Sequence, residues 1–266
     1  MFNVGRMARE KVHRYFGRTE LLIGEAGLQR LQAARIAIFG MGGVGSYAVE
    51  ALARSGVGFL RIVDFDIVGA SNFNRQLYAL HSTLGQQKVE VAAARVRDIN
   101  PEIILDVRPA FFHHDTADEL LAAPLDFVID AIDSLGPKCE LLAQCVERGI
   151  PVISAMGAAA RTDATALQVG SIWETHNCPL ATKVRRTLRK RGINVALPVV
   201  FSTEPAAPTY SAEELGEQQA EEVLRRGRQR RILPSMAMLP GMVGLLAANY
   251  VVGEMTGSTF NVQRSM

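Results

Sequence analysis

The stretch RIAIFGMGGVGSYAVEALARSG, residues 35–56, decides the fold of this chain. Residues 36–39 form a short apolar run, which is typical of a parallel strand that is buried on both faces. The run ends at a glycine-rich turn, and apolar residues then recur at helical spacing until Ser55 and Gly56. A strand, a glycine turn and a helix in this order direct the N–H groups of the helix N-terminus at a phosphate. The turn fits G-x-G-x-x-G at Gly40, Gly42 and Gly45, with Gly43 as an additional glycine.

An acidic residue follows the glycine turn at the spacing of a nucleotide site. A second strand is expected over residues 59–63, and it ends at Asp64, about 20 residues beyond the glycines. A carboxylate at this position commonly binds the ribose of a nucleotide. The alternative is a Rossmann-like unit whose glycines only allow close packing of the helix. The combined pattern favours a nucleotide ligand.

The alternation of elements predicts the fold class. Strand and helix patterns alternate through residue 155, which is typical of a parallel sheet covered by helices. We expect an α/β fold with a doubly wound, mainly parallel Rossmann-like sheet, helices on both faces and a basic C-terminal extension. Further strands are expected over residues 103–107, 126–130, 150–155, 166–169 and 197–202, and helices over 115–122, 135–148 and 178–192. The expected organisation is an N-terminal helical segment at 1–34, a nucleotide-binding domain at 35–175 and the extension at 176–266.

Composition indicates a soluble cytoplasmic protein. The chain has 266 residues and a net charge of +2, which is too small to predict a polyanionic partner from charge alone. The N-terminus is charged and lacks the apolar core of a signal peptide. Residues 232–253 carry no charge and are long enough to span a bilayer, but prolines and glycines interrupt them. A buried core helix, packed on the domain, is therefore favoured over a membrane helix.

Cysteine and histidine positions do not predict a metal centre. Cys139, Cys145 and Cys178 never form a C-x-x-C pair, so the sequence supports neither a disulfide framework nor a zinc site. Residues 113–115 read His-His-Asp, but adjacent side chains on a loop usually diverge. We therefore expect reduced thiols and no zinc.

Polar residues accumulate between the second strand and the next helix without a helical or strand period. Such density indicates a site, because positive side chains beside a phosphate-binding turn stabilise charge that develops on a polyphosphate. The alternative is ordinary turn chemistry, since Asn and Asp are common in loops. The residues concerned are Asp64, Asp66, Asn72, Arg75, Gln76 and Lys88.

Two acids follow the strand expected over residues 126–130. Asp130 and Asp133 are placed at the carboxyl end of a parallel strand, on the same edge as the glycine turn. A carboxylate there can hold Mg²⁺ together with phosphate oxygens, because Mg²⁺ takes few protein ligands and keeps waters. Asp133 or Ser134 could also cap the helix that follows.

The C-terminal third contains two basic clusters. One is the helix expected over residues 178–192, and the other is the run at 225–231, beyond a linker at 204–222 that we expect to be mobile. These clusters predict a local footprint for a nucleic-acid backbone, although a solvated helix face would have a similar composition. The helical candidates for this contact are Lys183, Arg185, Arg186, Arg189 and Lys190.

The motifs GMGGVG, VDFD, NxNRQ, GQxKVE and DAIDS occur in this order, and in this the chain resembles the adenylating enzymes related to ubiquitin activation. The resemblance covers about residues 10–175 and implies an adenylation domain that binds ATP and Mg²⁺. It implies that Gly40, Gly42, Gly43 and Gly45 line the ATP site and that Asp64 binds the ribose, with Asp66 beside it. It further implies that Asn72, Arg75, Gln76 and Lys88 surround the phosphates, that Asp133 coordinates Mg²⁺ and that Arg18 acts across a homodimer.

Members of this family activate a carboxylate by attack on the α-phosphate of ATP. The chain lacks the two C-x-x-C pairs of members that activate sulfur-carrier proteins, and stretches such as CPLATKVRRTLRKRGI resemble the branch that dehydrates threonylcarbamoyladenosine in tRNA. The resemblance therefore implies tRNA, not DNA or a membrane, as the partner. The alternatives are adenylation of a sulfur-carrier protein, a NAD-dependent dehydrogenase and a scaffold without activity. Cys178 could relay an acyl group, but a structural cysteine is favoured.

Overall fold

The computed structural model describes residues 4–210 and 232–257 of the chain. A seven-stranded sheet has the order β3-β2-β1-β4-β5-β7-β6. All neighbouring strands run parallel except β6 and β7, which pair antiparallel at one edge. The strands are β1 Arg35–Phe39, β2 Phe59–Val63, β3 Ile104–Arg108, β4 Phe127–Asp130, β5 Val152–Ala155, β6 Leu167–Ser171 and β7 Pro198–Ser202.

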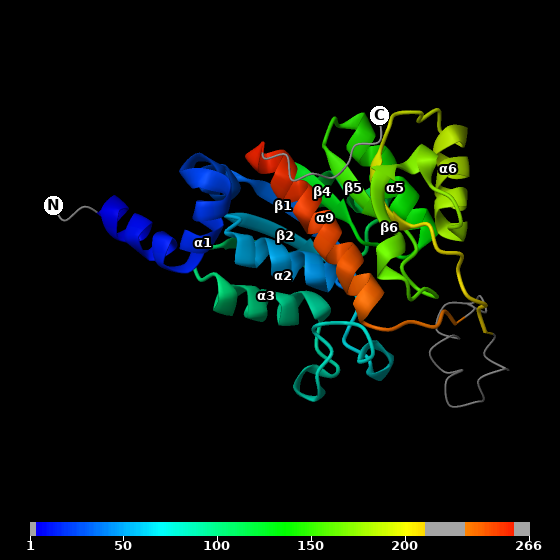
Figure 1. Cartoon of the computed structure of the whole chain (residues 1–266), viewed down its shortest axis with the longest axis horizontal. Helices are drawn as coiled ribbons and strands as arrows, with labels where there is room; N and C mark the ends of the chain where they lie inside the picture. The colour runs from blue at the N-terminus through cyan, green and yellow to red at the C-terminus, as the bar shows by residue number, and fades with distance from the viewer. Residues whose placement is uncertain (1–3, 211–231, 258–266) are drawn as a thin grey trace.

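Helices cover both faces of this sheet (Figure 1), which confirms the predicted fold class. Alternate residues of β1 belong to two separate hydrophobic clusters, because side chains of a strand point to opposite faces. Ile36 and Ile38 pack with α1, α2, α3 and α9, whereas Ala37 and Phe39 pack with α4, α5 and α6. The helices are α1 Val4–Ala33, α2 Gly45–Ser55, α3 Lys88–Ile99, α4 Ala117–Leu120, α5 Leu135–Glu147, α6 Pro179–Lys190 and α9 Met238–Thr256.

Two elements differ from the sequence-based expectations. The helix expected over residues 115–122 is shorter: a 3₁₀ turn at His114–Thr116 leads into the four-residue α4. Pro124 lies four residues beyond the end of α4 and disfavours a helical conformation for Ala123, the residue before it. The long helix α1 is interrupted at Gly24, whose φ of 76° lies in the left-handed region.

The C-terminal third contributes directly to the sheet and to the core. β7 lies inside the sheet, between β5 and β6, although it comes after residue 175 in the chain. α9 is long and apolar enough to cross a membrane, the one such helix among the described residues, and half of that stretch is buried inside the protein. α9 lies across α2 (Figure 1), so it packs as a core helix. The basic run at 225–231 and most of the expected mobile linker lie outside the described residues.

Candidate nucleotide site

The glycine turn joins β1 to α2 at the point where the strand order reverses, between β1 and β4. Gly40 has a φ of 96°, and a Cβ added there would lie 2.7 Å from the carbonyl oxygen of Ala131. A Cβ at Gly45 would lie 1.7 Å from the carbonyl oxygen of Gly40. Both positions therefore require glycine, because any side chain would collide with backbone. The turn is held against the chain that follows β4.

Asp64 lies beside this turn, as the spacing predicts. Its carboxylate accepts hydrogen bonds from the backbone N–H groups of Met41, at 2.5 Å, and Asp66, at 2.8 Å. Burial raises the pKa of the Asp64 carboxyl above its ordinary value, and the charge of Lys88 offsets only part of that rise. The structure thus places a partly buried carboxylate directly against the glycine turn.

Lys88 is the first residue of α3 and reaches back toward the end of β2. Its side chain is buried, and Nζ lies 3.4 Å from the carboxylate of Asp66. Its backbone N–H also donates to the carbonyl of Asp66, at 3.0 Å. Two contacts therefore fix the lysine next to Asp66, and its charge also acts on Asp64.

The loop of residues 69–76 packs against the glycine turn from another side. A Cβ at Gly43 would lie 3.3 Å from Cγ of Arg75, and one at Gly42 would lie 3.8 Å from the amide nitrogen of Gln76, which is buried. Asn72 accepts a hydrogen bond from the N–H of Gly69, at 3.0 Å, and so closes the turn that carries Arg75. The predicted residues of this loop are therefore brought together with the glycines.

The two acids of the DAIDS motif have different environments. Asp130 is fully buried, and its carboxylate accepts hydrogen bonds from Ser154 and from the Lys138 Nζ at 2.6 Å. Asp133 is exposed and accepts a hydrogen bond from the Ser134 hydroxyl, at 3.3 Å. Of these two acids, therefore, Asp130 is bound in the interior and Asp133 faces solvent.

Lys138 was not among the site residues predicted from the sequence. Its ammonium group also donates to the Ser154 hydroxyl, at 3.1 Å, and to the carbonyl of Ala155, at 3.0 Å, so each of its three N–H bonds has an acceptor. The Asp130 carboxylate in turn accepts from the N–H of Ile132, at 3.1 Å, which shapes the turn leading to Asp133. One signal was present: Lys138 follows Asp130 by eight residues and lies on the mostly apolar buried face of α5.

Comparison with known proteins assigns the fold to a family. The model of the ThiF family matches residues 16–264, which is most of the chain. The chain belongs to the ThiF family. The match includes the glycine turn, the polar loop and the DAIDS turn described above.

Two relatives cover this ThiF family protein almost end to end. The tRNA threonylcarbamoyladenosine dehydratase of Bacillus subtilis is 42% identical over 240 residues, which are 90% of this chain and 94% of that protein. The crystal structure of the Escherichia coli tRNA N6-threonylcarbamoyladenosine dehydratase in complex with ATP has a TM-score of 0.81 and 33% identity. The alignment with that structure covers 93% of this chain and 96% of the other.

A third relative matches over a shorter span. The molybdopterin-synthase adenylyltransferase of Escherichia coli is 37% identical over 137 residues, which are 52% of this chain and 54% of that protein. The similarity to this second kind of ThiF-like protein is therefore confined to about half of the chain.

Other predicted residues lie away from the glycine turn. Arg18 is an exposed residue of α1. The basic residues of α6 lie on the helix layer that packs against α5, on the other face of the sheet from α2. Of these, Arg185 donates to the carbonyl of Thr175, at 2.7 Å, and Arg189 lies over the ring of Trp173. Lys183, Arg186 and Lys190 are exposed.

Cys178 caps α6. The residue is buried, and its Sγ accepts a hydrogen bond from the N–H of Ala181 at 3.4 Å. A Cβ at Gly157 would lie 3.3 Å from the sulfur. These contacts agree with the structural role that the sequence favoured for this cysteine.

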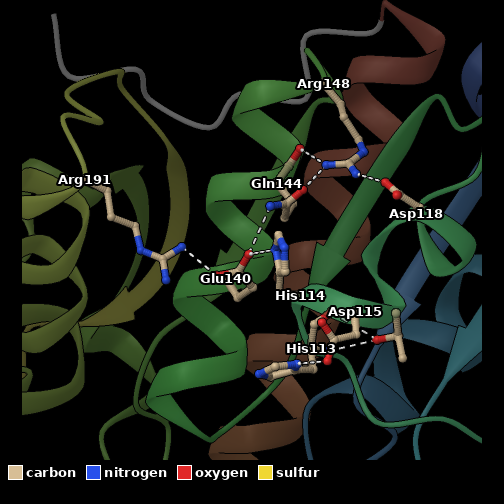
Figure 2. Close-up of polar contacts among 9 residues, drawn as sticks. His113, His114, Asp115, Asp118, Glu140, Gln144, Arg148 and Arg191 are labelled. Carbon is tan, nitrogen blue, oxygen red and sulfur yellow. Dashed lines mark hydrogen bonds and ion pairs between the residues drawn. The ribbon is translucent and has the colours of Figure 1, made fainter.

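Figure 2 shows a second polar cluster, centred on Glu140 of α5. The Glu140 carboxylate accepts from Arg191, at 2.7 Å, and Gln144, at 3.0 Å, and lies 3.6 Å from Nδ1 of His114. Burial raises the pKa of Glu140, but the bonds from Arg191 and Gln144 outweigh it, so this pKa lies below its ordinary value. No group of three His, Cys, Asp or Glu in the described part of the chain could hold a metal ion. We interpret the cluster as a set of structural contacts that holds the end of α6 against α5.

Proposed function

We propose that this protein is an ATP-dependent tRNA threonylcarbamoyladenosine dehydratase. The observation that carries the proposal is the glycine turn of β1 and α2, with Asp64, Arg75, Gln76 and Lys88 gathered around it. The end-to-end similarity to two proteins of that name supports the same function. Adenylation of a sulfur-carrier protein, the alternative from the sequence, is supported only by more distant relatives.

The reaction needs little proton transfer from the protein. The threonyl carboxylate of the modified adenosine is ionised near neutral pH and attacks the α-phosphate of ATP, so that an acyl adenylate forms and pyrophosphate leaves. A nucleophile of the same nucleoside then attacks the acyl carbon, and AMP leaves with one oxygen of the original carboxylate. The nucleoside has then lost one water and is cyclic. The protein contributes orientation and charge neutralisation.

The site residues have separable roles in this scheme. The glycine turn and the first N–H groups of α2 would bind phosphate oxygens, and Asp64 would accept hydrogen bonds from the ribose. Asn72 shapes the loop from which Arg75 and Gln76 would reach the phosphates. Lys88 lies beside Asp66 and would extend the positive charge along the polyphosphate.

The residues present fit one Mg²⁺ only together with phosphate groups. Asp133 is an exposed carboxylate on the edge of the sheet that carries the glycine turn, and it would hold the ion jointly with ATP oxygens and water. The bound ion would neutralise negative charge on the pyrophosphate leaving group.

Two further assignments belong to this proposal. The exposed basic residues of α6 would contact the tRNA backbone, and a second copy of the chain would bring its Arg18 to the phosphates. The part of α1 before Gly24 exposes Leu21 at 89% and Leu22 at 74%, and exposed apolar surface of this kind marks an interaction site. We propose a homodimer in the cytoplasm, where the three buried free cysteines would remain reduced.

Pyrophosphate release tests the function directly. The purified protein is given ATP with threonylcarbamoyl-modified tRNA or with unmodified tRNA, and the nucleosides are then analysed by mass spectrometry. We expect pyrophosphate only with modified tRNA, and a nucleoside lighter by one water. Asp133→Ala should reduce this turnover about 100-fold or more while the protein remains folded, because one ligand of the charge-neutralising ion is lost.

Three results would contradict the proposal or a part of it. Equal pyrophosphate release with both tRNAs would remove the modified nucleoside as substrate. Release that depends instead on a carrier protein ending in Gly-Gly would favour the alternative function. Wild-type turnover in Asp133→Ala would exclude the proposed magnesium role.

A further inference from the structure

Asn74 connects the phosphate-facing loop to a distant part of the chain. Its side-chain oxygen accepts a hydrogen bond from Nη1 of Arg75, at 2.8 Å, and its side-chain nitrogen donates to the backbone carbonyl of Ser235, at 2.8 Å. The same Nη1 of Arg75 donates to the carbonyl of Ser71, at 2.8 Å. A short amide side chain thus joins the arginine to a segment that lies 161 residues further along the sequence.

The segment that receives Asn74 is itself fixed on both sides. Ile232 exchanges two backbone hydrogen bonds with Tyr210, at 2.8 and 3.0 Å. The carbonyl of Pro234 accepts from the N–H of Ala160, at 2.7 Å. Further along, Cβ of Pro240 lies 3.2 Å from the position that a Cβ would take at Gly43 of the glycine turn. The Ser235 carbonyl is therefore a well-anchored acceptor.

We propose that Asn74 is a positioning residue for Arg75. The guanidinium group is planar and its N–H bonds have fixed directions, so acceptors at Ser71 and Asn74 define how the group is oriented. An orientation set before ATP binds reduces the conformational cost of the contact with phosphate. The side-chain nitrogen of Asn74 holds the amide in place through Ser235, so its oxygen faces Arg75. The inference rests on the proposed role of Arg75 at the phosphates.

A double-mutant cycle tests this coupling without the tRNA substrate. ATP affinity is measured by calorimetry for the wild type, Asn74→Ala, Arg75→Ala and the double variant, and circular dichroism checks that each is folded. We expect Asn74→Ala to weaken ATP binding about tenfold and Arg75→Ala to weaken it more. The double variant should bind like Arg75→Ala alone, because Asn74 acts only through the arginine.

Gln86→Ala is the matched control. Gln86 is exposed between the 3₁₀ turn at His81–Thr83 and α3, and its side-chain nitrogen donates to a backbone carbonyl, that of Ser82, at 2.9 Å. This variant removes the same kind of hydrogen bond away from Arg75, and its ATP affinity should equal that of the wild type.

Several outcomes would overturn the inference. Wild-type affinity in Asn74→Ala would exclude a positioning role, and so would full additivity of the two substitutions. If Gln86→Ala weakened ATP binding as much as Asn74→Ala, the effect would not be specific to the bond between Asn74 and Arg75. Wild-type affinity in Arg75→Ala would remove Arg75 from the phosphates and the inference with it. If modified tRNA did not cause pyrophosphate release, the proposed function would be contradicted. The double-mutant cycle would still test the role of Asn74, because it measures ATP affinity without tRNA.

Discussion

The carboxyl group of Asp64 shows how the site changes the chemistry of a single residue. Burial raises its pKa, so this carboxylate becomes protonated at a higher pH than an ordinary aspartate. If Asp64 binds the ribose, protonation weakens that contact. ATP affinity should therefore fall as the pH is lowered through the raised pKa. Asp64→Asn should bind ATP about 30-fold more weakly at neutral pH, equivalent to about 2 kcal/mol for hydrogen bonds to a charged group.

Calorimetry across the acidic pH range checks this expectation at the residue scale. The ratio of wild-type to Asp64→Asn affinity should decline toward one as the pH falls, because protonation and substitution remove the same charge. Asp98→Asn, which removes an exposed carboxylate from α3, should follow the wild type. A ratio that does not change with pH would exclude the ionised Asp64 from nucleotide binding.

α9 crosses α2 next to the glycine turn, and Gly244 lies where the two backbones approach closely. A Cβ at Gly244 would lie 2.2 Å from the carbonyl oxygen of Val44, the N-cap residue of α2, and 3.1 Å from the backbone nitrogen of Ala48 in the first turn of that helix. Gly244→Ala should lower the free energy of unfolding by about 1–3 kcal/mol and weaken ATP binding, because the backbones of α9 and α2 must move apart. Alanine's better helix propensity, at most about 1 kcal/mol, does not offset this.

Urea unfolding and ATP affinity measure both effects at the element scale. Gly136→Ala is the matched control, because Gly136 lies in α5 and a Cβ there meets nothing within 4 Å. That variant should be as stable as the wild type or more stable. If Gly244→Ala leaves both stability and ATP affinity unchanged, α9 does not constrain the glycine turn.

At the scale of the whole molecule, the proposed tRNA surface on α6 and the part of α1 before Gly24 lie at opposite ends (Figure 1). Replacing Lys183, Arg186 and Lys190 by alanine should weaken tRNA binding and reduce the slope of log affinity against log salt by about 2 to 3, if each side chain contacts a phosphate. Arg185 and Arg189 are left in place because they contact Thr175 and Trp173.

Filter binding at several salt concentrations checks this expectation. Arg97→Ala, which removes an exposed arginine near the end of α3, should leave both affinity and slope unchanged. A triple variant with the wild-type slope would show that the basic face of α6 is only solvated, and the adenylation site would be unaffected by that result.

The sequence by itself determined the framework of the nucleotide site. Strands β1 and β2 were predicted within one residue, because apolar runs that stop at Gly40 and Asp64, the second interrupted only by Arg61, are local signals. The fold class followed from the alternation of elements, and the family from the order of five motifs. Asp64, Arg75, Gln76 and Lys88 were recognised as site candidates because polar density without periodicity is also visible locally.

Only the tertiary structure decided contacts between distant segments. The place of β7 inside the sheet, the close crossing of α9 over α2 and the link from Asn74 to Ser235 join parts that are far apart in the sequence. Asp130 and Asp133 look equivalent in the sequence, yet Lys138 and Ser154 bind the first in the interior and leave the second exposed. Periodicity reports which face of an element is buried, but not which partner covers it, and that partner is fixed by packing of the whole chain.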